Sequence, residues 1–153
     1  AGTGIPVTVH VRSEGDGLLE SLEEWVTCAR RGDHTALMDS NLRLIYSDAY
    51  YRKNKRLIPM LAKLTKPDSY ERFLKQAEAC LTHNASEKLH TISSPTLVIG
   101  GERDHCLGGQ ASRDLATAIP GARLKMYPHY GHGVYDEAAD FQQVLLDFLT
   151  EKD

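Results

Sequence analysis

The chain has 153 residues, of which 41% are hydrophobic and 25% charged, a composition typical of one globular domain with a hydrophobic core. A formal net charge of −3 offers no basic surface for nucleic acid, and no apolar run approaches the ~20 residues that a membrane span needs. We therefore expect no nucleic-acid partner and no membrane partner. The first residues also show no export signal.

The cysteine content gives a further expectation. Cys28, Cys80 and Cys106 are an odd number and include no C-x-x-C pair. Such a set predicts free thiols in a cytoplasmic protein rather than a disulfide framework. Cys28 and Cys80 fall on the apolar faces of predicted helices, so we expect both to be small core residues.

The first two predicted elements are a strand and the start of a long helical region. Residues 5–11 (IPVTVHV) alternate in part and are β-branched, which predicts a strand. Residues 18–89 are predicted to be helical throughout. Two arginines and Gly32 end the first helix of this region, and Asp33 can cap the second.

The rest of the helical region contains two more predicted helices. A tyrosine-rich helix is expected over residues 46–64, and a further helix is expected to start at Asp68 or Ser69 after a Lys-Pro turn. The tyrosines at 46, 50 and 51 could line a substrate cleft, although tyrosines that pack between helices are commoner. The region as a whole predicts a compact helical layer that packs on another part of the protein.

The last stretch changes character. Residues 95–100 (PTLVIG) are continuously apolar between a proline and a glycine, which favours a buried parallel strand. A helix over 110–119, an alternating strand over 123–127 and an amphipathic helix over 138–149 follow. This alternation of strands and helices predicts an α/β fold with a parallel sheet.

Each of these two strands is followed by a loop with a candidate catalytic residue. Asp104 lies in the loop after the first strand, and His132, between two glycines, lies in the loop after the second. Functional groups of parallel sheets collect at the carboxyl ends of the strands. A histidine that takes a proton from a nucleophile, oriented by a carboxylate, is the chemistry of acyl transfer. A zinc site at His129 and His132 is disfavoured because no third ligand has a matching spacing.

Two segments carry a resemblance to a known family. PTLVIGGERD resembles the late strand and acid loop of α/β-hydrolases, and YPHYGHGVYDEAADF resembles their last strand, histidine loop and final helix. The resemblance runs from about Trp25 to the C-terminus and is most specific over residues 95–149. It implies that Asp104 is the acid and His132 the base of a catalytic triad, in the chain order of that family.

The resemblance also implies a domain organisation. Residues 1–17 would be a strand and linker of the hydrolase core, residues 18–90 a helical cap or lid, and residues 91–153 the C-terminal part of the core. The fold class expected is thus α/β, the late parallel strands of an α/β-hydrolase sheet with crossover helices and a helical cap.

The nucleophile of this family has no match in the sequence. The family's G-x-S-x-G elbow and the oxyanion loop before it are absent. The nearest approach surrounds Ser13, where Val11 replaces the first glycine, and Ser112 falls inside a predicted helix. The resemblance therefore implies that a missing N-terminal half supplies the nucleophile and that this chain alone is inactive.

The implied function is hydrolysis of an ester, thioester, amide or related bond in a small-molecule substrate, without a cofactor. The alternative is a truncated, non-catalytic chain that acts as a binding or assembly module. In both cases the apolar strand over 95–100 needs neighbouring strands and two covering layers. We therefore expect the chain to self-associate or to pair with the missing half.

Overall fold

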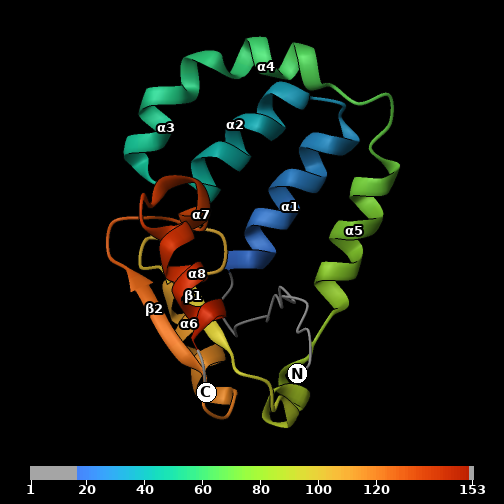
Figure 1. Cartoon of the computed structure of the whole chain (residues 1–153). Helices are drawn as coiled ribbons and strands as arrows, with labels where there is room; N and C mark the ends of the chain where they lie inside the picture. The colour runs from blue at the N-terminus through green and yellow to red at the C-terminus, as the bar shows by residue number, and fades with distance from the viewer. Residues whose placement is uncertain (1–16, 152–153) are drawn as a thin grey trace.

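The computed structural model describes residues 17–151. The strand predicted over residues 5–11 and the candidate Ser13 lie outside it. A helical layer comes first, and a small α/β unit follows (Figure 1). The layer comprises α1 (Gly17–Arg30), α2 (His34–Ile45), α3 (Asp48–Asn54), the 3₁₀ turn η1 (Lys55–Leu57), α4 (Ile58–Thr65), α5 (Glu71–Thr82) and the 3₁₀ turn η2 (Ser86–Thr91). The α/β unit comprises β1 (Leu97–Gly101), α6 (Gly109–Ala118), β2 (Arg123–Tyr127), α7 (Val134–Glu137) and α8 (Phe141–Thr150).

The two strands form a parallel sheet, as the sequence predicts. Leu97 lies opposite Arg123, and Gly101 lies opposite Tyr127. The crossover helix α6 packs on both strands. The parallel register places the loops after β1 and β2 at the same edge of the sheet, which is where the candidate residues were expected.

Two predicted helices differ from the helices of the structure. The tyrosine-rich helix expected over residues 46–64 is divided into α3, η1 and α4, with Pro59 in the first turn of α4. Proline has no N–H to donate and suits the start of a helix rather than its interior. The final helix expected over 138–149 starts at Phe141 as α8, and the short helix α7 over Val134–Glu137, which was not expected, precedes it.

Two smaller expectations also need correction. Helix α5 starts at Glu71, and Ser69 lies before it and accepts a hydrogen bond from the Glu71 N–H. Cys80 is exposed rather than part of the core, because it lies on the outer side of α5, whereas Cys28 is half-buried and packs against the core. No disulfide joins the three cysteines.

Two hydrophobic clusters support the site. The larger cluster lies mainly between α1, α2 and α5, and it includes Cys106 from the loop after β1. Within the helices the indole Nε1–H of Trp25 donates to Ser40 Oγ at 3.0 Å. The smaller cluster joins the end of β2 to α7 through Tyr127 and Val134. The loop after β1 is thus anchored in the helical layer, while β2 and α7 form a core of their own.

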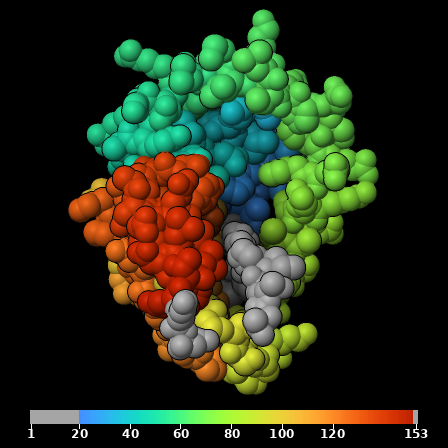
Figure 2. All heavy atoms as spheres, in the orientation of Figure 1, coloured from blue at the N-terminus to red at the C-terminus, as the bar shows by residue number. Residues whose placement is uncertain are grey.

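Figure 2 shows the α7–α8 segment directly beneath the α2–α3 part of the helical layer, and hydrogen bonds from Tyr46 and Ser47 to Asp136 and Glu137 of α7 join the two. No helix within residues 17–151 combines the length and the apolar character that a bilayer crossing requires.

Candidate active site

Asp104 is fixed by its own loop. It lies three residues after β1, and its Oδ1 accepts hydrogen bonds from the backbone N–H groups of Cys106 and Leu107, both at 2.8 Å. The side chain is only 6% exposed. A short loop that folds back on its own aspartate is typical of this residue type, and here it leaves Oδ2 directed at the next loop.

His132 receives that second oxygen. Its Nδ1 lies 2.9 Å from Asp104 Oδ2. Because a carboxylate has no proton to donate, the ring N–H is the donor, which leaves the lone pair of a neutral imidazole on Nε2. The structure therefore brings together the two residues that the sequence singled out, 28 positions apart.

The backbone holds the two loops in register. The Glu102 N–H donates to the Tyr127 carbonyl at 2.9 Å, and the Arg103 N–H donates to the Tyr130 carbonyl at 3.1 Å. Glu102 also forms an ion pair with Arg113 of α6. Both loops thus continue the pairing of the strands beyond the sheet. This pairing brings the side chains of Asp104 and His132 to the same level above the sheet edge.

The electrostatics of Asp104 favour its ionised form. Burial by itself would raise the pKa of this carboxyl, but the hydrogen bonds from His132 and from the Leu107 and Cys106 amides outweigh it, and the pKa is lowered from 3.8. The carboxylate is therefore charged at neutral pH and can stabilise a protonated imidazole.

Glycines make the close approach of the loops possible. A Cβ on Gly101 would lie 2.2 Å from the Gly131 carbonyl oxygen, and a Cβ on Gly131 would lie 2.8 Å from the Ile45 carbonyl oxygen. A Cβ on Gly133 would lie 2.6 Å from the ring of Tyr46. The glycines on both sides of His132 are thus required by contact with the helical layer, a reason that the sequence did not reveal.

The junction between α2 and α3, residues 45–47, holds the far side of the histidine loop. The Gly133 N–H donates to the Ile45 carbonyl at 2.7 Å, and the Tyr46 hydroxyl donates to Asp136 Oδ2 at 2.7 Å. The Glu137 carboxylate accepts from both the N–H, at 2.9 Å, and the hydroxyl of Ser47. Sequence analysis missed this junction.

The tyrosines of this region pack and hydrogen-bond. Tyr46 stacks on Tyr50, with ring centroids 4.3 Å apart, and Tyr51 donates to Asp39 at 2.9 Å. Burial and the hydrogen bond to Asp136 raise the pKa of Tyr46. These contacts give Tyr46 and Tyr50 the packing role that the sequence analysis held to be the commoner one.

Other nucleophilic side chains near the sheet are poorly placed for catalysis. Burial, together with the Asp104 charge, raises the pKa of Cys106 to about 12, so its thiol is not activated. Ser112 lies on α6 and packs against Gly100 of β1, as expected for a crossover helix.

His105 and His129 are exposed, and no group of three or more metal-binding side chains is found within residues 17–151.

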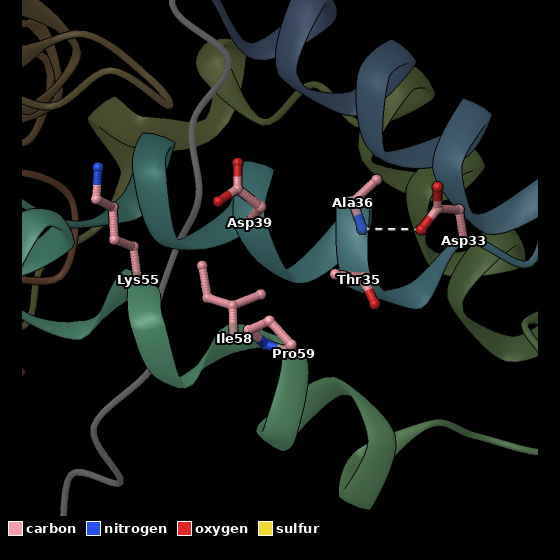
Figure 3. A pocket seen from close by; sticks show the side chains of 7 residues that line it. All are labelled: Asp33, Thr35, Ala36, Asp39, Lys55, Ile58 and Pro59. Carbon is pink, nitrogen blue, oxygen red and sulfur yellow. Dashed lines mark hydrogen bonds between the residues drawn. The ribbon is translucent and has the colours of Figure 1, made fainter.

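An open groove of about 540 Å³ lies in the helical layer, between α2 and the η1–α4 segment (Figure 3). Asp33, Asp39 and Lys55 contribute its charged groups, and Ile58 and Pro59 form the facing side. None of its lining residues belongs to the loops of Asp104 or His132, so the groove is separate from the candidate site.

Known proteins resemble this chain in sequence and in fold. A family model described as alpha/beta hydrolase fold matches residues 14–139. RutD of Pseudomonas savastanoi pv. phaseolicola, a proposed carbamate hydrolase, is 35% identical over 81 residues, which are 52% of this chain and 31% of RutD. The 2-hydroxy-6-oxononadienedioate/2-hydroxy-6-oxononatrienedioate hydrolase of Klebsiella pneumoniae is 34% identical over 90 residues, 57% of this chain and 31% of that protein.

Solved structures show the same fold. MGS-M2, an alpha/beta hydrolase enzyme from a Medee basin deep-sea metagenome library, superimposes with a TM-score of 0.83 at 22% identity. That superposition covers 94% of this chain and 55% of MGS-M2. The enol-lactonase of Burkholderia xenovorans LB400 gives a TM-score of 0.72 at 26% identity, covering 86% of this chain and 51% of the enzyme. The chain therefore spans about half the length of these solved structures.

Proposed function

Because this chain belongs to the α/β-hydrolase fold family, we propose that it supplies the acid, Asp104, and the general base, His132, of a hydrolase. One observation carries the proposal. The two side chains form a 2.9 Å hydrogen bond at the carboxyl ends of neighbouring parallel strands, the edge where this type of sheet gathers functional groups.

The two residues would share the work of acyl transfer. Asp104 holds the imidazole in one tautomer and stabilises its protonated form, while Nε2 of His132 takes a proton from the nucleophile and returns it to the leaving group. This chemistry suits an ester, thioester, amide or related bond in a small molecule and needs no cofactor. The hydrolase names of the relatives support this class of reaction.

We propose that the nucleophile and the oxyanion hole come from a part of the protein N-terminal to this chain, and that the chain alone is inactive. The high pKa of Cys106 and the position of Ser112 support this proposal. The family order of nucleophile, acid and histidine also supports it.

Fluorophosphonate labelling of the protein that contains this chain tests both proposals. The reagent phosphonylates an activated serine and releases fluoride, and peptide mapping then identifies the labelled residue. We expect the label on a serine outside this chain. We also expect His132→Ala to slow labelling by about 10²–10⁴-fold, the usual contribution of a general base.

His129→Ala is the matched control, because His129 lies in the same loop with an exposed side chain. It should label at the unaltered rate. Unchanged labelling of His132→Ala would contradict the role of His132, and a label on a serine of this chain would contradict an external nucleophile.

The predicted partner is the nucleophile-bearing half or a second copy of the chain. Within residues 17–151 the sheet has two strands, fewer than sheets of this class usually contain, and Val98 of β1 is buried. Exposed strand edges favour association. We expect the isolated chain to sediment above 17.0 kDa, and a monomer at all concentrations would contradict this expectation.

A further inference from the structure

Helix α4, together with Leu57 at the end of η1, exposes an apolar stripe on the outside of the helical layer. Leu57, Met60, Leu61 and Leu64 are 46%, 55%, 38% and 74% exposed, and their spacing places them on one side of the helix. The other side of α4, which includes the buried Ile58, packs on α2. The four exposed side chains, called the α4 outer face below, therefore point away from the core.

The same segment concentrates positive charge. Residues 52–66 contain six lysines and arginines and no aspartate or glutamate, although the whole chain carries a net charge of −3. The six side chains are exposed: Arg52, Lys53, Lys55, Arg56, Lys63 and Lys66. Arg52 pairs with Asp48, and Lys55 lies over the ring of Tyr51. For the other four, no ion pair with a carboxylate is found among the described residues.

We propose that the α4 outer face docks on the surface of an anionic lipid membrane. An exposed apolar stripe beside unpaired cations is the pattern of a helix that lies in the interface of a bilayer, with its apolar side chains inserted and its cations near the lipid headgroups. The expectation of no membrane partner was based on the net charge of the whole chain and on the lack of an apolar run long enough to span a bilayer. Neither property describes the local surface of α4.

The position and charge of α4 favour a membrane over a protein. Figure 1 places α4 along the edge of the helical layer opposite the sheet, and Figure 2 shows side chains projecting outward there. A two-fold contact between copies would bring the six cations of one chain against those of the other. The face is the outer side of a single helix, whereas a peptide helix is usually recognised in a groove.

Vesicle co-sedimentation tests this surface without any assay of hydrolysis, so its outcome is independent of the proposed function. We expect the chain to sediment with phosphatidylcholine vesicles that contain phosphatidylserine, to remain in solution with pure phosphatidylcholine vesicles, and to be released by salt. Lys63→Gln with Lys66→Gln removes two charges and should weaken binding by about 30-fold.

The pair Leu61→Gln with Leu64→Gln removes two of the inserted apolar side chains and should abolish binding. Leu146→Gln with Leu149→Gln is the matched control, because those leucines of α8 are 54% and 53% exposed outside the α4 outer face. Failure to bind phosphatidylserine vesicles, or binding unaffected by either α4 pair, would overturn the proposal. Lipid-free dimerisation that the Leu61/Leu64 pair removes would assign the face to a second copy instead.

Discussion

The Asp104→Asn substitution tests the candidate pair in this chain without reference to activity. It keeps the shape of the side chain and removes its charge. The asparagine carbonyl can still accept from the Cys106 and Leu107 amides. Its NH₂ group, however, would face the His132 Nδ1–H, so the charge-assisted hydrogen bond is lost, and a neutral one can replace it only if the imidazole proton moves to Nε2.

The structure allows the cost to be worked out. The Asp104 side chain is 6% exposed, so water compensates little for the lost contact. A hydrogen bond to a charged group contributes roughly 1.5–3 kcal/mol, and the two remaining bonds weaken because their acceptor becomes neutral. Because the other imidazole tautomer can restore a weaker, neutral bond, we expect Asp104→Asn to lower the free energy of unfolding by about 1–3 kcal/mol at neutral pH.

The pH dependence gives a second, independent measurement. Because the folded-state pKa of Asp104 lies below 3.8, the unfolded chain binds its proton more readily. The stability contributed by the ionised carboxylate is therefore fully present above pH 3.8 and is lost as pH falls through the folded-state pKa. Asp104→Asn should lack this part of the acid dependence.

Urea unfolding followed by Trp25 fluorescence and by circular dichroism measures both effects. Asp114→Asn, at an exposed position of α6, is the matched control and should change stability by less than about 0.5 kcal/mol. Equal stability of Asp104→Asn and the unaltered chain at neutral pH would refute the reasoning. An unchanged acid dependence in the variant would refute the assignment of that dependence to Asp104.

Three further substitutions or modifications test other parts of the structure. Ser40→Ala removes the acceptor of the Trp25 indole, which should cost about 1–3 kcal/mol and shift the emission of the only tryptophan; unchanged emission would contradict the contact. Gly101→Ala places a Cβ against the Gly131 carbonyl and should push the two loops apart. The downfield NMR signal of the His132 Nδ1–H bonded to Asp104 should then disappear, and its persistence would argue against the close approach of the loops. Cys80 is the exposed cysteine and should react with maleimide before the other two in the native chain, as mass mapping can show.

The parts of the fold that local sequence determines were predictable. Residues 123–127 form the expected strand, and Asp33 accepts a hydrogen bond from the Ala36 N–H as the expected helix cap. The candidate pair was predictable for a related reason. Two loops that follow adjacent parallel strands must lie at one edge, so Asp104 and His132 needed no long-range information beyond the pairing of β1 with β2.

What the sequence could not reveal depends on contacts between distant residues. Glu137 and Ser47 are 90 positions apart, and nothing in the sequence around either residue points to the other. The exposure of Cys80 had a different cause. A cysteine at helical spacing fits the apolar side of an isolated helix, but only the neighbours of α5 decide which side becomes the core.

These distant contacts connect the helical layer to the proposed base. The histidine loop is bonded to Asp104 on one side, and on the other its Gly133 N–H is bonded to the Ile45 carbonyl. Glu137, five residues after the histidine, holds Ser47 of the same junction. The helical layer therefore cannot move off the sheet as a rigid body without breaking these bonds. If His132 is the base, any opening of the layer at this junction must also release the loop that positions its ring.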